Sequence, residues 1–134
     1  MTKLKFDLNE LYSSPHPTYI VTMDGEILLF ANPAAFAANQ NVLDDFLGKS
    51  VASFSYPEEL ESRKAMLRSQ GKLTNYEYKG LNYYKDTEEW RRKEVKIIGE
   101  QSLVEFFGLE CHLSIDLKIE EIRRFGEEEA TLSQ

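Results

Sequence analysis

The sequence predicts an α+β domain in which antiparallel strands are combined with short helices. Three observations support this fold class: two strand-like segments flank Asp24-Gly25, helix-forming segments fill the middle of the chain, and strand patterns dominate the last half. The chain has 134 residues, of which 42% are hydrophobic and 29% charged, as in a globular protein of one domain.

Composition also argues against several function classes. The net charge of -7 would repel a phosphate backbone on average, so we expect no nucleic-acid partner. A single cysteine excludes an internal disulfide and any metal site built from several cysteines. The first residues carry Asp7 and Glu10 among leucines and do not form a signal peptide, and no window approaches the ~20 apolar residues of a membrane span. We therefore expect a cytoplasmic location without membrane contact.

The chain is expected to begin with a short amphipathic helix, because Leu4, Leu8 and Leu11 recur at helical spacing. Two prolines in "SSPHP" end it, since they remove backbone donors and favour extended geometry. Two strands follow, Tyr19–Met23 and Glu26–Ala31. Asp-Gly between them supplies the positive φ that a two-residue hairpin turn requires.

Two helices are expected in the middle of the chain. Asn32 is a favourable N-cap and Pro33 suits the first helical position, so an alanine-rich helix should begin directly after the hairpin. A longer helix is predicted over Tyr56–Gln70, where Ser55 and Glu58 have the spacing of a capping box. Between these helices, short apolar groups indicate one or two brief helical turns.

The last half predicts three strands followed by a helix. The strands are "LTNYEYKGLNYYK", "WRRKEVKII" and the alternating stretch "LVEFFGLECHLSID", with turns at "DTEE" and "GEQS". After them Ile115, Ile119 and Ile122 are spaced by four and three, which predicts a helix with a narrow apolar seam.

This order of elements, with these residues, resembles a PAS domain, the sensory module of bacterial kinases, cyclases and regulators. The likeness covers roughly Leu11 to Arg124, and it rests on "LYSSPHPTYIVTMDGEILLFANPAA", "LGKSV", "YPEEL", the strand pair around "DTEE" and "LSIDLKIEEIRR". The most specific part is "DGEILLFANPAA". Two departures are "DTEE", where many members have Asp-Gly, and "DLKIEE", where many have Asp-Ile-Thr-Glu-Arg.

The resemblance implies a five-stranded antiparallel sheet with short helices on one face and a pocket between them. It divides the chain into an N-terminal helix that covers the sheet or a dimer partner (1–14), the core (15–116), and an exit helix with an acidic tail (117–134). The implied function is sensory: the domain binds a small ligand, dimerises, or does both, and relays a signal through its terminal helices. If the parent chain continues, an output domain of a two-component system would follow.

Enzyme activity, haem binding and cysteine-based flavin photochemistry are not expected. The sequence has no glycine-rich phosphate loop, kinase signature or nucleophile elbow. PAS domains that bind haem place a histidine on the long helix, and Tyr56–Gln70 contains none. Light-sensing flavin relatives carry a cysteine just before that helix, whereas the cysteine here is Cys111 on the last strand. The cofactor, if any, stays unknown.

The resemblance also implies a set of pocket residues. In flavin-binding relatives the residue two before the strand-ending aspartate points at the ligand, which is Ser114 here, and alternation places two further residues on its face. Asn82 takes the position of a ligand-contacting asparagine and shares its parity with two tyrosines. The candidate ligand-binding residues are therefore Asn82, Tyr78, Tyr84, Glu110, His112 and Ser114. Alternatively, these side chains satisfy one another or face water.

The opposite face of the last strand is too apolar to face solvent alone. We expect the N-terminal helix to lie on it and a second subunit to complete a homodimer, although burial within one chain is the alternative. The candidate interface residues are Leu8, Leu11, Phe107, Leu109, Leu113, Ile115, Ile119 and Ile122. Two other functions stay open: a ligand-free interaction module, and a small cone-shaped isomerase or hydrolase, which the early position of the hairpin disfavours.

Overall fold

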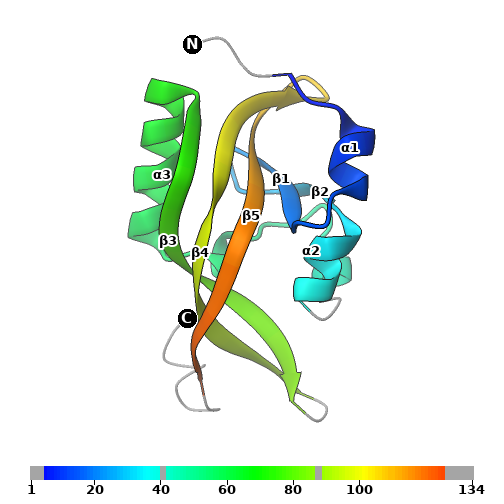
Figure 1. The fold of residues 1–134 in the computed structure, drawn as a ribbon, viewed down its shortest axis with the longest axis vertical. Coiled ribbons are helices and arrows are strands. Elements are labelled where there is room, and N and C mark those ends of the chain that lie inside the picture. Colours follow the sequence, from blue (N-terminus) through cyan, green and yellow to red (C-terminus); the bar gives the residue numbers. More distant parts are fainter. Residues whose placement is uncertain (1–4, 40–41, 87–88, 126–134) are drawn as a thin grey trace.

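The computed structural model describes residues 5–39, 42–86 and 89–125. Its five strands form one antiparallel sheet in the order β2-β1-β5-β4-β3 (Figure 1). The strands are β1 (Thr18–Thr22), β2 (Leu28–Ala31), β3 (Lys72–Asp86), β4 (Glu89–Phe106) and β5 (Leu109–Arg124). The helices are α1 (Leu8–Ser13), α2 (Pro33–Ala38) and α3 (Pro57–Gln70), with the 3₁₀ turns η1 (Val42–Asp45) and η2 (Ala52–Phe54). The predicted α+β class and the five-stranded sheet are confirmed.

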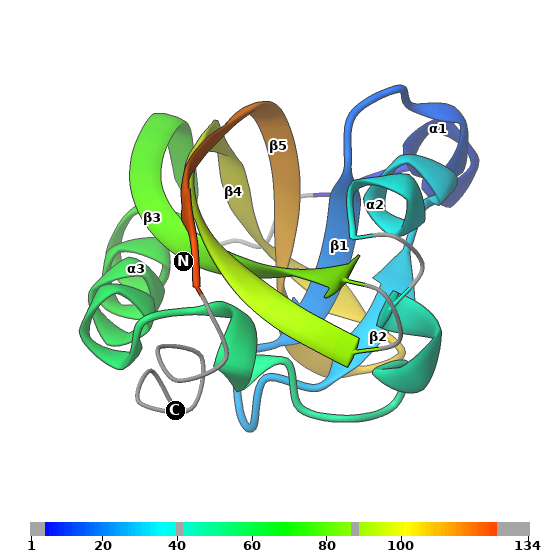
Figure 2. The ribbon, with the colours of Figure 1, turned by 90° about the horizontal axis from the view of Figure 1, so that it is seen from below.

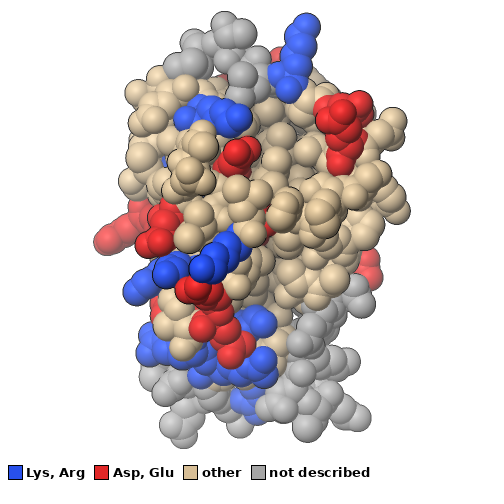
Figure 3. All heavy atoms as spheres, in the orientation of Figure 1, with Lys and Arg blue, Asp and Glu red and all other residues tan. Residues whose placement is uncertain are grey.

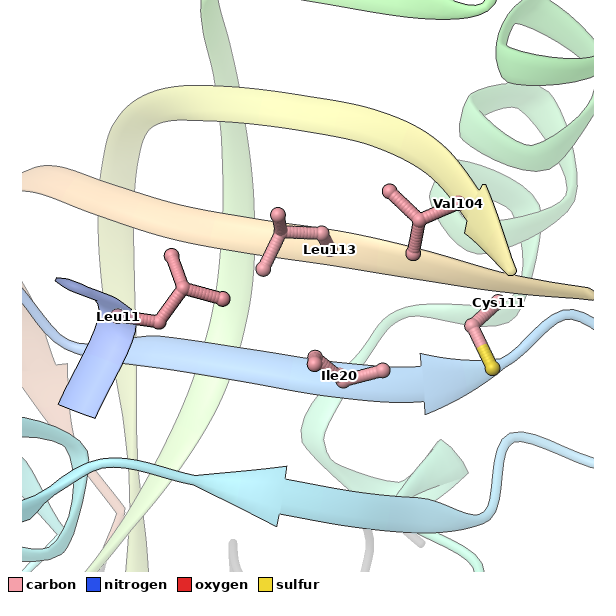
Figure 4. Packing of buried hydrophobic residues seen from close by; sticks show 5 residues of the cluster. All are labelled: Leu11, Ile20, Val104, Cys111 and Leu113. Carbon is pink, nitrogen blue, oxygen red and sulfur yellow. The ribbon is translucent and has the colours of Figure 1, made fainter. Parts of the chain in front are cut away.

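Helices and 3₁₀ turns cover both faces of the sheet. On the inner face lie α2, η1, η2 and α3, which pack over the strands as a roof (Figure 2). On the outer face α1 places Leu11 against an apolar cluster from β1, β4 and β5 (Figure 4). The buried members of this outer cluster are Leu11, Ile20, Val104, Cys111 and Leu113.

The first hairpin has a longer turn than the sequence predicts. Four residues separate Thr22 from Ile27, and the Thr22 amide donates to the Ile27 carbonyl at 2.9 Å. Positive φ occurs at Gly25 (82°) and Glu26 (51°). The predicted two-residue turn is wrong because the Thr22 hydroxyl bridges the loop, accepting from the Ile27 amide at 2.8 Å and donating to the Asp24 carbonyl at 2.7 Å.

Asn32 caps α2, as predicted, and also fastens the N-terminal segment. Its side-chain oxygen accepts from the amides of Ala35 (2.9 Å) and Thr18 (3.0 Å). Its amide nitrogen donates to the carbonyls of Leu11 (2.8 Å) and His16 (2.9 Å). One fully buried side chain therefore joins α1, β1 and α2.

The start of α3 differs from the prediction in its cap. Tyr56 is the N-cap and makes no capping bond through its side chain. The predicted capping box of Ser55 and Glu58 is wrong, because the Ser55 hydroxyl accepts instead from Arg63 at 3.2 Å. Gly71, with φ of 78°, ends the helix in the left-handed conformation that glycine adopts readily.

The strands of the last half have different limits from those predicted. The expected turn at "GEQS" is wrong, because β4 continues through it and Gln101 pairs with Ser114 of β5. The turn lies instead at Phe107 and Gly108, with φ of 52° and 75°. The expected "DTEE" turn falls partly on residues 87–88, outside the described residues.

The predicted exit helix is wrong over the described residues. β5 continues as a strand to Arg124, with Ile119 opposite Ile97 and Arg123 opposite Glu94. The reason is that residues 93–98 of β4 offer β5 backbone partners along this length, and β-branched isoleucines suit a strand. The tail over 126–134 lies outside the described residues.

Residues 93–98 of β4 and 118–124 of β5 form an extension of the sheet. This β4–β5 extension carries a dense set of charges. Figure 3 shows lysines, arginines and carboxylates gathered over the lower part of the sheet, below a largely uncharged area. Lys96 lies 3.3 Å from Glu120 across the two strands, and Lys118 lies 2.9 Å from the same carboxylate. The extension is therefore a solvated, paired surface.

The candidate interface residues fall into two groups. Leu11 and Leu113 are buried within the single chain, and Ile115 and Ile119 are half-buried. The exposed group consists of Leu8, Phe107, Leu109 and Ile122. A homodimer through these side chains stays a prediction.

Candidate functional site

A cavity lies between the inner face of the sheet and its roof. It offers about 80 Å³ to the centres of water molecules, and one water needs roughly 10–15 Å³ on that measure. The floor comes from β1, β3, β4 and β5, and the roof comes from the β1–β2 turn, η2 and α3. The space suits several waters or one small organic molecule.

Four of the six predicted ligand-binding residues line this cavity: Tyr78, Asn82, His112 and Ser114. Tyr78 and Asn82 come from β3, which has regular pairing with β4 through Gly80, so their shared parity is kept. His112 and Ser114 come from β5, opposite Val21 and Tyr19 of β1. Their role in binding stays a prediction, but their place in one cavity is observed.

The other two predicted residues lie outside the cavity. Tyr84 is buried further along β3, where Arg124 lies 4.4 Å from its ring centre and its hydroxyl donates to the Phe125 carbonyl at 3.4 Å. Glu110 is exposed beside the β4–β5 turn, with an oxygen 4.0 Å from Arg68. The alternation of side chains along a strand predicts which face a residue is on, but not which residues of that face reach the cavity.

Five polar lining residues were missed by the sequence interpretation: Tyr19, Glu26, Ser55, Arg63 and Asp116. Asp116 has the parity of Ser114, so continuing the alternation by one step would have found it. Arg63 follows Leu60 by three residues and precedes Leu67 by four, so helical spacing places it on the apolar face of α3. A charged residue on such a face was the available signal.

Arg63 reaches the cavity from α3 and is 3% exposed. Its Nη2 donates to Glu59 at 3.0 Å and to Ser55 at 3.2 Å, and its guanidinium lies 4.4 Å from the ring centre of Tyr78. Its Nε has no hydrogen-bond partner among the described residues. The guanidinium is thus oriented by three neighbours while one donor is unused.

His112 lies on the cavity floor and is 5% exposed. Neither ring nitrogen has a hydrogen-bond partner in the described part of the chain. Burial lowers the pKa of His112 to about 3, and the positive charges of Arg63 and Lys64 lower it further in the same direction. The imidazole is therefore neutral at physiological pH, with one donor and one acceptor to offer.

Asp116 lies at the edge of the same floor and is 4% exposed. Its Oδ1 has no partner within the described residues. Burial raises the pKa of Asp116 to about 7, although the positive charge of Arg63 acts against this shift. The carboxyl group is therefore divided between its two protonation states near neutral pH.

The remaining polar groups are neutral hydrogen-bonding side chains. Burial, followed by the charge of Asp116, raises the pKa of Tyr19 well above its usual value, and the same two causes raise the pKa of Tyr78. The Tyr19 hydroxyl accepts from Asn39 at 3.1 Å, and the Ser114 hydroxyl accepts from Gln101 at 2.5 Å. Both tyrosines keep their protons at physiological pH.

The site has the composition of a small-molecule binding site. Buried polar groups converge on a concave space whose other wall is apolar, which is the usual form of ligand pockets. Within the described ranges no three His, Cys, Asp or Glu side chains are grouped so as to hold a metal ion. Likewise, no helix of the described chain has the length and apolarity needed to span a membrane.

Comparison with solved structures shows that the chain has the fold of PAS domains. No family model and no curated protein matches the sequence. Among solved structures, the PAS domain of an HTR-like protein from Haloarcula marismortui matches with a TM-score of 0.54 and 17% identity, over 84% of this chain and 91% of the other. A PAS domain from Colwellia psychrerythraea gives 0.55 and 12%, over 86% and 92%. The PAS domain of nitrogen regulation protein NR(II) from Vibrio parahaemolyticus gives 0.52 and 15%, over 89% and 100%.

Proposed function

Because the chain has the PAS fold, we propose that it is a non-catalytic sensory domain that binds a small molecule in its internal cavity. The observation that carries this proposal is the set of unpartnered polar atoms around that cavity: Arg63 Nε, both ring nitrogens of His112, and Asp116 Oδ1. Buried polar groups in proteins are almost always paired, and an unpaired one costs about 1–3 kcal/mol. A ligand that pairs several of them would recover part of that cost.

The cavity floor offers a route by which occupancy changes the rest of the chain. His112, Ser114 and Asp116 belong to β5, the strand that also forms the extension ending at Arg124. The pairing of β4 and β5 shifts register between Ile98 and Gly99, next to Asp116. We propose that a ligand touching these side chains favours one arrangement of this irregular point, as a population shift.

The broader role is proposed from the fold. Solved structures with this fold include a PAS domain from a two-component sensor histidine kinase and the PAS domain of nitrogen regulation protein NR(II). By analogy, the present domain serves signal transduction in the cytoplasm and controls an output domain if its parent chain continues.

A second candidate function is a ligand-free dimerisation or interaction module. Large apolar side chains are exposed near α1 and the sheet: Leu8, Tyr12, Phe107, Leu109, Leu117 and Ile122. A second copy of the chain that covered them would need no ligand. In this alternative the cavity is a packing defect filled by water.

Native mass spectrometry of protein purified from cells, without added ligand, separates the two functions. We expect extra mass that is lost on denaturation, or a stabilising hit in a metabolite thermal-shift screen. Val51→Phe would fill the cavity from the roof and remove both signals, whereas Leu109→Phe, on the exposed side, would keep them. Unliganded protein without hits, whose dimer dissociates in Ile122→Asp, would support the second function.

A further inference from the structure

The cavity has one apolar wall and one polar wall. Val51 and Phe54 line the roof side together with Leu28 of β2, and Ile97 lines the floor between the polar residues of β3 and β5. Such a two-sided space suits a ligand with a short hydrocarbon body and one polar end, because each wall can be satisfied only by its own kind of group.

The polar wall contains unused hydrogen-bond donors. Arg63 uses Nη2 for Glu59 and Ser55, which leaves Nε–H without a partner. Neutral His112 contributes one N–H and has one acceptor nitrogen, neither of them paired within the described residues. Near neutral pH, the protonated form of Asp116 adds a further donor.

Two positively charged side chains act on His112. Lys64 is buried next to Arg63, and although it pairs with Glu26 at 2.5 Å, both cations lower the pKa of His112. Glu59 takes only one nitrogen of the Arg63 guanidinium. An anionic acceptor placed against the free edge of that guanidinium would form the stronger, charge-assisted kind of hydrogen bond.

We infer that the ligand is a small monocarboxylate, with its carboxylate group bound between Arg63 and His112 and its hydrocarbon body against the roof. This inference rests on the proposed function and assigns a chemical class to its ligand. With about 80 Å³ of space and roughly 10–15 Å³ for each water-sized group, the acid would have about five to eight non-hydrogen atoms.

Binding of such an acid should take up a proton. A carboxylate in the cavity favours the neutral form of Asp116, because two like charges in one buried site repel. Affinity should therefore fall as the pH rises through the pKa of Asp116, which is about 7. If only the protonated form binds, the loss between pH 6 and pH 8 is about tenfold. The other charged or titratable groups that face this site are Tyr19, Glu26, Glu59, Arg63, Lys64, Tyr78 and His112.

The test is calorimetric titration of the whole 134-residue chain with butyrate, isovalerate and hexanoate, each beside its amide and its amine counterpart. At pH 6 we expect an acid to bind with one-to-one stoichiometry and the amides and amines to bind at least tenfold more weakly. Arg63→Gln should weaken acid binding at least tenfold and Arg63→Lys less, whereas the exposed Arg68→Gln should leave it unchanged. Asp116→Asn should bind the acid equally at pH 6 and pH 8.

The possible failures are distinguishable. Preferential binding of an amide or amine, or acid binding that is indifferent to Arg63→Gln, overturns the carboxylate class and leaves the sensory function intact. If no probe binds, the mass released from cell-purified protein decides: a carboxylic acid supports the inference and any other compound overturns it. If neither probe nor released mass is found, the inference and the proposed function fall together.

Discussion

The two faces of β5 carry opposite kinds of side chain, although both are buried. Cys111 and Leu113 point outward into the apolar cluster beneath α1. The alternate residues His112, Ser114 and Asp116 point inward to the cavity. A sheet that is covered on both sides would ordinarily be apolar on both. The inner face of β5 differs, because buried hydrogen-bonding side chains stand where apolar side chains would pack.

This difference separates stability from binding within one strand. The outer face gains free energy from close apolar packing, at about 25 cal/mol per Å² of area removed from water. The inner face holds a cavity and several unpartnered polar atoms, and each of these features is unfavourable without a ligand. Substitutions at neighbouring positions of β5 should therefore change the unfolding free energy by different amounts, and at His112 in the opposite direction.

The largest effect is expected on the outer face, for Leu113→Ala. Leu113 is 6% exposed and packs with Leu11 and Ile20. Its truncation removes buried methyl groups and leaves a cavity, which costs about 2–5 kcal/mol of unfolding free energy. Urea denaturation followed by circular dichroism measures this loss.

The matched control for Leu113→Ala is its neighbour Ser114→Ala. Removing the Ser114 hydroxyl leaves the buried side-chain amide of Gln101 without its acceptor, so we expect a loss of about 1–3 kcal/mol, smaller than that of Leu113→Ala. Equal losses at positions 113 and 114 would show that the two faces do not divide stability as described.

The second effect is a pair of opposed pH dependences on the inner face. The raised pKa of Asp116, about 7 against 3.8, means that the folded state binds more protons between these values, so stability from this group falls as the pH rises from 4 to 7. The lowered pKa of His112, about 3 against 6.5, means that the unfolded state binds more protons, so stability from this group rises between pH 3 and 6.5. Each slope is at most about 1.4 kcal/mol per pH unit.

Between pH 4 and 6.5 the pH dependences of stability from Asp116 and His112 nearly cancel in the unsubstituted chain. Single substitutions should therefore reveal each of them. Relative to the unsubstituted chain, Asp116→Asn should gain stability as the pH rises from 4 to 7. His112→Leu should show its greatest relative gain at pH 4 and lose that advantage toward pH 6.5. Denaturation curves at half-unit intervals of pH measure both, and parallel profiles for all three chains would contradict the assignment.

The third effect is the residual gain of His112→Leu at pH 7, where the imidazole is already neutral. Leucine has a similar volume and leaves no unpaired ring nitrogen, so we expect the unliganded chain to become more stable by about 1 kcal/mol. The measurement is the thermal midpoint in phosphate buffer. A loss of stability would indicate that His112 has a bound water or ligand as its partner.

The same comparison explains what the sequence could and could not predict. Alternation along β5 correctly separates His112 and Ser114 from Leu113, because the side-chain period of a strand is two. The cap at Asn32 is also a local property, and it is confirmed. Both features depend on only a few neighbouring residues.

The errors concern features that depend on distant partners. Isoleucines spaced by four and three suggested a helix after Ile115, but β5 continues because β4 lies beside it as far as Arg124. Arg63 was missed because a charged residue on a helix usually faces solvent, and here the cavity receives it. The continuation of β5 depends on its pairing with β4, and the burial of Arg63 depends on the packing of α3 over the sheet. Neither can be predicted from neighbouring residues alone.

The smallest expected effect concerns the exposed turn that joins β4 to β5, at Phe107. Its φ is 52° and that of Gly108 is 75°, so both central residues of this two-residue turn have the positive φ of a type I′ hairpin. Asparagine adopts this conformation more readily than a bulky aromatic residue, so Phe107→Asn should stabilise the monomer by up to about 1 kcal/mol. Phe107→Val, which is β-branched, should destabilise it.

Phe107 is 87% exposed, so a folded single chain gains little from its ring beyond the contact with Phe106, 4.5 Å between ring centres. Thermal midpoints of Phe107→Asn, measured over a hundredfold range of protein concentration, therefore test both the strain of the turn and the role of the ring. A midpoint that rises equally at all concentrations indicates a strained turn. A midpoint that falls further as the concentration rises would mean that the ring contacts a second copy of the chain.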